Sequence, residues 1–179
     1  MTEYSQSNAF TWANTMHDLI SNYNVSAVDH GSGFNGLENE LIVLKHNGRQ
    51  YLGYERTKYY YVIGQYSRFV KPGSRRVKAD STNHAVRATA YKNGQNLVIV
   101  AINNLNTPKT VQFHLNGLSG IREVRPIRTS NTEIGQCLTP FTTADRLSRR
   151  PYPKLVSQHS SPTDSTTEVA VGSTFDVMM

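Results

Sequence analysis

The sequence predicts an α+β protein in which two helices and a few strands precede a block made only of strands. Apolar residues recur at helical spacing in two segments before residue 73. Between residues 74 and 133 they alternate with a period of two, and from residue 134 the pattern is lost. The chain has 179 residues, enough for one domain with a substantial core. We therefore expect three regions: residues 1–73, 74–133 and 134–179.

The first expected element is an amphipathic helix over residues 8–23. Its apolar positions follow steps of three and four: Ala9, Trp12, Ala13, Met16, Leu19, Ile20 and Tyr23. Ser7 or Asn8 can cap its start, because a side-chain oxygen there accepts a hydrogen bond from a backbone N–H that has no partner inside the helix. The letters NYN then end the helix. VSAVDH, residues 25–30, is expected to form a short strand.

A hairpin and a second helix follow the glycine-rich loop GSGFNG. The apolar run LIVL and the segment QYLG flank HNG, whose residues tolerate the positive φ angles of a tight turn. Helical spacing then recurs in the apolar residues Tyr59, Val62, Ile63, Tyr66, Phe69 and Val70, and Pro72 with Gly73 ends this helix. Residues 1–73 therefore have the order of two β/α units, which alone cannot close a barrel.

The block over residues 74–133 is expected to be an antiparallel sandwich or sheet. Its strands are predicted at RRVKAD, HAVRATAYKNG, NLVIVAINN, KTVQFHLNG and IREVRPIRTS, with turn residues between them. NLVIVAI is apolar throughout, which is typical of a central strand that is covered on both faces. Residues 134–179 are rich in Ser, Thr and Pro and are expected to form a largely disordered tail.

Composition excludes several classes of function. The net charge is +6, but the basic residues are spread along the chain among acidic ones, so nucleic-acid binding is not expected. There is one cysteine and no zinc-type Cys/His spacing, so no metal site is expected. No apolar run is long enough to cross a membrane, and no signal peptide is recognisable. Asn24-Val25-Ser26 is the one N-glycosylation sequon.

The segment YYVIGQYSRFVKPGSRRV resembles glycoside hydrolase family 30, in which such a stretch is the last barrel helix running into a side β-sandwich. AYKNGQNLVIVAINN and GIREVRPIRTSNTE resemble the sandwich strands of that family, and MTEYS resembles the end of its seventh barrel strand. The resemblance covers roughly residues 1–133. It implies that residues 1–73 are a remnant of a (β/α)₈ barrel, its last two β/α units, and that residues 74–133 are the β-sandwich side domain.

The resemblance also implies a function. Family 30 enzymes hydrolyse β-linked glycans with retention, on glucosyl, xylan-type or β-1,6 linkages, and their full-length members are secreted. Glu3 would be the catalytic nucleophile, and Tyr4, His30 and Phe34 would contact the substrate. For His30 and Phe34, ordinary loop structure is the equal alternative. The resemblance implies a polysaccharide or oligosaccharide partner and no cofactor, and nothing in the sequence indicates the oligomeric state.

Departures from the family pattern limit this expectation. Retaining hydrolysis needs a second carboxyl group, which the family carries on the fourth barrel strand, and no segment of this chain corresponds to that strand. Four other carboxylates could supply it, and nothing in the sequence singles out one of them as the acid/base: Asp18, Asp29, Glu38 and Glu40. We therefore expect the isolated chain to be inactive. We also expect Met1 to be an internal residue of a longer protein and the tail after Glu133 to reflect a shifted frame or a splice variant.

The alternative hypothesis is a non-catalytic carbohydrate-binding module formed by residues 74–133. An exposed Tyr91 with basic neighbours would supply its sugar-stacking surface. For the contact between the second helix and the sandwich, we expect Tyr59, Tyr60, Ile63 and Phe69.

Overall fold

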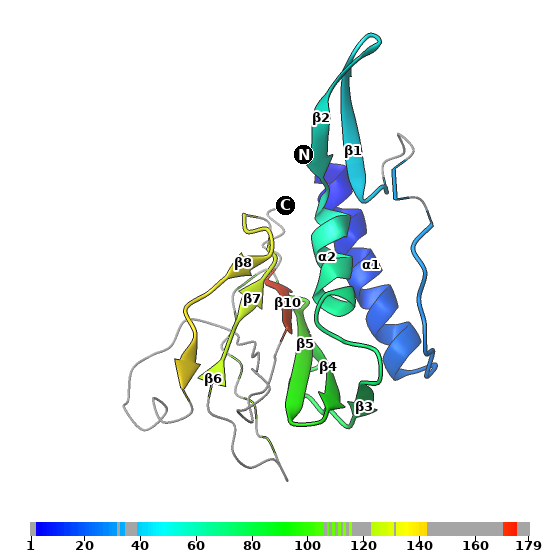
Figure 1. Ribbon diagram of the computed structural model, residues 1–179. Helices are drawn as coiled ribbons and strands as arrows, with labels where there is room; N and C mark the ends of the chain where they lie inside the picture. Colours follow the sequence, from blue (N-terminus) through cyan, green and yellow to red (C-terminus); the bar gives the residue numbers. More distant parts are fainter. Residues whose placement is uncertain are drawn as a thin grey trace. The chain divides into compact units, whose positions relative to one another are not determined.

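A computed structural model of the chain describes residues 3–31, 33–34, 39–105, 107, 109, 111, 113, 115, 123–130, 132–142 and 170–174 (Figure 1). The chain divides into two compact units, Met1–Gly64 and Gln65–Met179. This division falls inside the second helix, and the expected domain boundary at residue 73 stays a prediction. Each unit is described by itself below.

Helix α1, Glu3–Ser21, starts earlier than predicted. Its buried stripe is Ala9, Ala13 and Met16, at the spacing that places side chains on one helix face. Ser7 and Asn8 do not cap the helix, because the helix already continues through them. The segment EYSQSNA holds neither Pro nor Gly, and a carboxylate at a helix start is favoured by the macrodipole, so the helix extends back to Glu3.

The predicted strand at residues 25–30 is absent. Residues 22–31 are irregular, and Asn24 has a φ of 55°. A barrel strand is held by hydrogen bonds to a strand on each side. No described strand of the unit Met1–Gly64 pairs with residues 25–30, so the sequence VSAVDH has no ladder to join.

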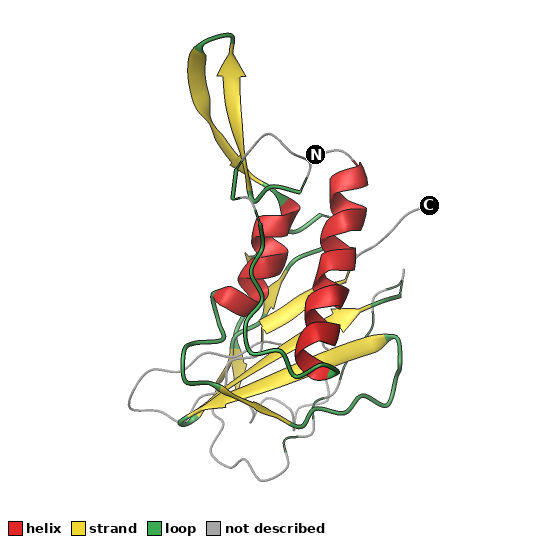
Figure 2. Cartoon of the chain, turned by 90° about the vertical axis from the view of Figure 1, so that its right-hand side faces the viewer, coloured by secondary structure: helices red, strands yellow, loops and turns green. Residues whose placement is uncertain are grey.

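The predicted hairpin is confirmed. Strand β1, Ile42–Asn47, pairs antiparallel with strand β2, Gln50–Arg56, and both views show the two strands extending beyond the helices of this unit (Figure 1, Figure 2). Asn47 faces Gln50, so the loop has two residues, and Gly48 opens it with a φ of 60°. A positive φ at the first loop position is the reason that a glycine is needed there.

Helix α2, Lys58–Ser67, confirms the second predicted helix but ends before Phe69. Thr57 is its N-cap: the Thr57 hydroxyl accepts a hydrogen bond from the backbone N–H of Tyr60 at 3.4 Å. The same hydroxyl donates to the carbonyl of Glu40 at 2.6 Å. This hydrogen bond links the start of α2 to the segment just before β1.

The unit Gln65–Met179 is built on a six-stranded sheet with the order β3-β4-β5-β10-β7-β8. A smaller sheet pairs β6 with β9. Strand bounds are Arg75–Val77 for β3, Val86–Asn93 for β4, Asn96–Asn103 for β5, Glu123–Val124 for β6, Ile127–Arg128 for β7, Gln136–Cys137 for β8, Phe141–Thr142 for β9 and Ala170–Thr174 for β10. Pro126 separates β6 from β7, because proline has no N–H to give to a ladder.

Strand β5 is the central strand, as its apolar sequence predicted. It lies between β4 and β10, and its residues from Leu97 onward are all buried. On one face, Leu97, Ile99 and Ala101 form the core with Ala90 of β4. Val111, Phe113 and Leu115 pack against this cluster at a spacing of two, which is the alternation predicted for KTVQFHLNG. The intervening residues of that segment lie outside the described part of the chain.

The last turn of α2 contacts the sheet of the same unit. The ring of Tyr66 meets the ring of Tyr91 of β4 edge to face, with centroids 6.4 Å apart. Gln65 donates from Nε2 to the hydroxyl of Thr129, which follows β7, at 2.9 Å. Of the expected contact residues, Phe69 lies beyond the helix end and is half-buried. Tyr59, Tyr60 and Ile63 belong to the unit Met1–Gly64, and their contact with the sheet stays a prediction.

Regular structure occurs in the tail that was expected to be disordered. Strands β8, β9 and β10 all lie within residues 134–179. Strand β10 pairs parallel with β5 and with β7, so it fills the centre of the sheet. Ala170–Thr174 reads AVGST, and such a short apolar stretch becomes a strand only when two neighbours supply hydrogen bonds on both sides. In the described residues, no helix is long and apolar enough to cross a membrane.

Candidate functional site

Glu3 and Tyr4 are the first two residues of α1. Only their backbone is described, so their roles remain predictions.

His30 is held in an aromatic cluster of the unit Met1–Gly64. Its ring lies 5.3 Å from the ring of Trp12, edge to face, and 5.5 Å from the ring of Tyr59. Nε2 lies 2.7 Å from the carbonyl oxygen of Asn39, to which it donates. The Trp12 indole nitrogen is buried and has no hydrogen-bond partner among the described residues. His30 thus contacts α1, α2 and the residue Asn39 that lies between them in sequence. These contacts are compatible with a structural role, the alternative to substrate binding that the sequence left open.

The surroundings of Phe34 and of three of the four alternative carboxylates are described. The Phe34 side chain is 64% exposed. Asp29 is exposed, Glu40 is buried, and Asp18 accepts a hydrogen bond from the Asn22 amide at 2.9 Å. Glu38 lies outside the described residues. No group of three or more His, Cys, Asp or Glu side chains in the described ranges is arranged to hold a metal ion.

An exposed aromatic surface lies on the β1–β2 hairpin. We define the hairpin aromatic face as Tyr51, Tyr54, Arg56 and Tyr60. Tyr51 and Tyr54 are each 55% exposed, and Tyr60, in the first turn of α2, is 37% exposed. The Arg56 guanidinium lies over both neighbouring rings, 5.8 Å from the centroid of Tyr54 and 5.1 Å from that of Tyr60. Cation–π contacts therefore hold Arg56 between two tyrosines at the surface.

A hydrogen bond of Arg56 and an ion pair between the strands stabilise the same hairpin. A hydrogen bond with Tyr61 is the main cause that raises the pKa of Arg56. On the neighbouring strand, Lys45 contacts the Glu55 carboxylate at 2.7 Å, and this hydrogen bond lowers the pKa of Glu55. An ion pair between the two strands thus stabilises the hairpin. Such a contribution matters because an isolated two-stranded hairpin has only marginal stability in water.

Tyr91 does not offer the sugar-stacking surface expected of it. Its side chain is only 6% exposed, and burial raises the pKa of its phenol. The ring faces Tyr66 and not solvent. The prediction of an exposed Tyr91 was wrong because residues at alternate positions of β4 are covered on both faces of the sheet. The exposed tyrosines Tyr51 and Tyr54 lie instead on the hairpin. They are three residues apart, and the register shift between Lys45 and His46 lies between their partners, so no simple alternation in the sequence indicated them.

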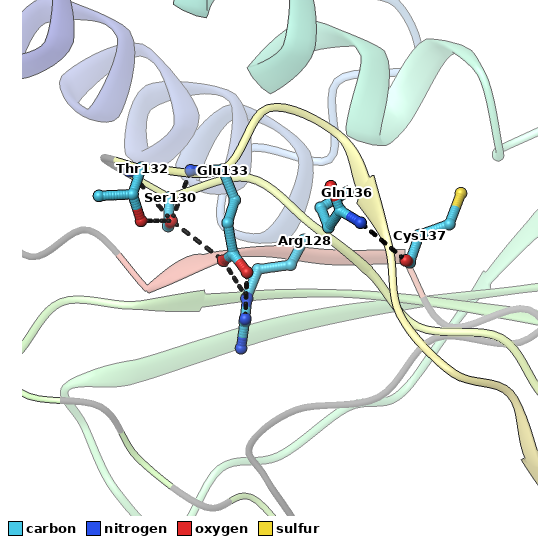
Figure 3. Close-up of polar contacts among 6 residues, drawn as sticks. All are labelled: Arg128, Ser130, Thr132, Glu133, Gln136 and Cys137. Atoms are coloured by element: carbon cyan, nitrogen blue, oxygen red, sulfur yellow. Dashed lines mark hydrogen bonds and ion pairs between the residues drawn. The ribbon is translucent and has the colours of Figure 1, made fainter.

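A polar network closes the turn between β7 and β8 (Figure 3). Arg128 forms a two-pronged ion pair with Glu133, and the Glu133 carboxylate accepts from the hydroxyl of Ser130 at 3.1 Å. The Ser130 hydroxyl accepts from the backbone N–H of Glu133 at 3.0 Å. Thr129, which is fully buried, accepts from the N–H of Gly135 at 3.2 Å as well as from Gln65. These contacts fix the turn between β7 and β8.

The arrangement of α1, hairpin, α2 and sheet can be compared with solved structures. One match is a GH30 endoxylanase from Clostridium papyrosolvens, with a TM-score of 0.56 and 21% sequence identity. The chain shares its fold with part of that GH30 enzyme. The match covers 76% of this chain and 35% of the endoxylanase chain, so this chain spans about a third of that structure. No family model matches the sequence.

The fold likeness agrees with the resemblance seen in the sequence. It supports a GH30-like fold for a chain of mixed helices and mainly antiparallel sheets. The assignment of the first region to a barrel remnant and of the second to a sandwich remains a prediction, as do the roles of Glu3, Tyr4, His30 and Phe34.

Proposed function

We propose that this chain is the C-terminal portion of a GH30-type retaining β-glycan hydrolase and that Glu3 is its nucleophile. The observation that carries the proposal is the fold likeness to a GH30 endoxylanase over 76% of the chain. The segments that resemble family 30 in sequence are also the ones that make the contact between Gln65 and Thr129. A shared fold alone does not fix a reaction, so the proposal depends on the position of Glu3 at the start of α1.

In this mechanism Glu3 forms a covalent bond to the sugar. Its carboxylate attacks the anomeric carbon, the bond to the leaving sugar breaks, and a glycosyl ester forms. A second carboxyl group protonates the leaving oxygen and then takes a proton from the water that hydrolyses the ester. The two carboxyl groups must stand about 5–5.5 Å apart for this retaining reaction.

The second carboxyl group would come from a part of the enzyme that this chain does not contain. In the described residues, Glu40 is buried and Asp18 is bonded to its own helix turn, so neither is suited to reach a sugar. We therefore expect no turnover by the isolated chain. Its substrate in the complete enzyme would be a β-linked glycan of the glucosyl, xylan or β-1,6 class, and the complete enzyme would act outside the cell.

The test is an assay of the isolated chain on aryl β-xyloside and aryl β-glucoside, with the wild type and Glu3→Gln compared. No release of the aryl group by either protein is expected. Release by the wild type that disappears in Glu3→Gln would show that the chain carries its own acid/base, and it would overturn the inactivity of the isolated chain.

A second candidate function is non-catalytic glycan binding, and the hairpin aromatic face is the observation that favours it. Tyrosine rings stack on the apolar faces of sugars, and a guanidinium held between two rings offers hydrogen-bond donors in a fixed position. The burial of Tyr91 removes the reason to place such binding on the sheet. Calorimetry with soluble xylan and β-glucan tests this candidate, because heat of binding without hydrolysis would favour it.

A further inference from the structure

We infer that Asn24 is an acceptor site for an N-linked glycan. Asn24-Val25-Ser26 is the single Asn-x-Ser/Thr sequon of the sequence, and neither Val25 nor the following Ala27 is a proline that would block its use. The inference rests on the proposed function in one respect, namely that an enzyme acting outside the cell passes through the secretory pathway. It goes beyond that function, because no step of the hydrolysis involves Asn24.

The structure places the whole sequon at the surface. Asn24, Val25 and Ser26 are all exposed, and they lie in the irregular segment that follows α1. Tyr23, just before the sequon, is 74% exposed. A glycan is bulky and hydrated, so an acceptor asparagine must keep its side-chain amide outside the folded protein. An exposed turn after a helix meets this condition.

The backbone at Asn24 forms a tight turn that presents the sequon. Asn24 has a φ of 55°, and the chain then reverses so that the N–H of Val25 reaches the carbonyl of Leu19 at 3.0 Å. Asparagine tolerates this left-handed conformation better than most residues that carry a side chain. The residue type is therefore compatible with the turn itself and with the modification.

The site lies far from the proposed nucleophile. α1 runs from Glu3 to Ser21, and 19 residues of α-helix rise about 28 Å. In both views the turn after α1 lies at the end of the unit Met1–Gly64 that is opposite the hairpin, whereas the start of α1 lies at the same end as the hairpin (Figure 1, Figure 2). A glycan at Asn24 would therefore cover neither Glu3 nor the hairpin aromatic face.

The chemistry is a glycosyl transfer from a lipid-pyrophosphate oligosaccharide. The Asn24 side-chain nitrogen, Nδ2, forms a bond to the anomeric carbon of the first sugar. The bond between that carbon and the pyrophosphate oxygen breaks, and the lipid pyrophosphate leaves with the electron pair. Nδ2 loses one proton, and no oxidation or reduction occurs.

The test uses the full chain, produced in a eukaryotic cell behind a cleavable secretion leader and followed by a C-terminal reporter sequon. The reporter marks the molecules that have entered the secretory pathway. We expect the wild type to carry one glycan more than the reporter does, and a peptide N-glycosidase to remove it and leave Asp at position 24. Peptide mass spectrometry reads both events directly, whether or not the chain has enzymatic activity.

Matched variants test whether the extra glycan is attached to Asn24. Asn24→Gln and Ser26→Ala should each lose the extra glycan, and Ser26→Ala does so without changing the residue in the left-handed conformation. Ser26→Thr should keep the glycan, and so should Asn22→Gln, which lies two residues upstream. An unmodified Asn24 in molecules whose reporter is glycosylated overturns the inference. That result would leave the role of Glu3 untouched, since glycan occupancy does not depend on hydrolysis.

Discussion

Gln65 of α2 donates a hydrogen bond to Thr129, and both side chains are buried in the unit Gln65–Met179. Gln65 lies in YYVIGQYSRF, and Thr129 lies in IRTSNTE. These are two of the segments that resemble family 30, and 63 residues of sequence separate the two side chains. The hydrogen bond therefore links the last turn of the helix to the far part of the sheet, where local sequence patterns give no information.

Removing the Thr129 hydroxyl should destabilise this unit. In Thr129→Val the buried amide of Gln65 and the N–H of Gly135 both lose their acceptor, and an unsatisfied buried donor costs about 1–3 kcal/mol. Urea unfolding of the two proteins measures the difference. Thr132→Val is the control, because Thr132 is exposed and should change stability by less than about 0.5 kcal/mol. Equal midpoints for Thr129→Val and wild type would contradict this role.

Tyr66 should contribute more to stability than Phe69. Tyr66 is 6% exposed and meets Tyr91, whereas Phe69 is half-buried beyond the helix end. Deleting a buried aromatic ring costs about 3–5 kcal/mol, and deleting a partly exposed one costs less. Thermal unfolding of Tyr66→Ala and Phe69→Ala compares them. A larger loss for Phe69→Ala would show that the helix–sheet contact has been assigned to the wrong residue.

If the hairpin aromatic face binds glycans, Tyr54→Ala should weaken retention on xylan. Truncation removes the ring that stacks and also one of the two rings that hold Arg56. Affinity electrophoresis in a gel containing soluble xylan measures retention. Tyr91→Phe is the matched control, because that ring is buried and its loss of one hydroxyl leaves the surface unchanged. Equal mobility of Tyr54→Ala and wild type in a gel that retains the wild type would exclude this surface.

The Lys45–Glu55 pair should make the hairpin sensitive to acid. The pKa of Glu55 is lowered in the folded chain by its hydrogen bond with Lys45, so the stabilisation is present above the unfolded pKa of Glu and is lost as pH falls through the folded value. An NMR titration of the Glu55 carboxyl measures its midpoint. Lys45→Met should raise that midpoint and Lys45→Arg should keep it low. The same midpoint in wild type and Lys45→Met would show that the pair does not form in solution.

Local signals in the sequence predicted the local structure well. Asn47-Gly48 and Asn93-Gly94 each indicated a tight turn, and in the structure each glycine opens a two-residue loop, with φ of 60° and 59°. The unbroken apolar run of β5 predicted a strand buried on both faces. The apolar spacing of residues 59–66 predicted α2, and Pro72 with Gly73 limited how far it could extend.

What depends on distant partners could not be predicted from the sequence. VSAVDH has a strand-like composition, but it has no neighbouring strand among the described residues and remains irregular. AVGST is shorter and less apolar, yet it forms β10 because β5 and β7 flank it. The alternation of apolar residues in β4 predicted that Tyr91 lies on a face of the sheet that is open to solvent. The ring of Tyr66 covers Tyr91 on that face, which only the structure shows. The role of Glu3 depends in the same way on a carboxyl group elsewhere.

The most direct test of the proposed function is chemical rescue of the full-length protein that the gene encodes, with Glu3 in the present numbering changed to Gly. Hydrolysis of aryl β-xyloside should be lost in Glu3→Gly. Added azide should restore release of the aryl group by attacking the anomeric carbon from the side that Glu3 occupied, and the product should be a glycosyl azide of inverted configuration. Undiminished hydrolysis by Glu3→Gly would show that Glu3 is not the nucleophile.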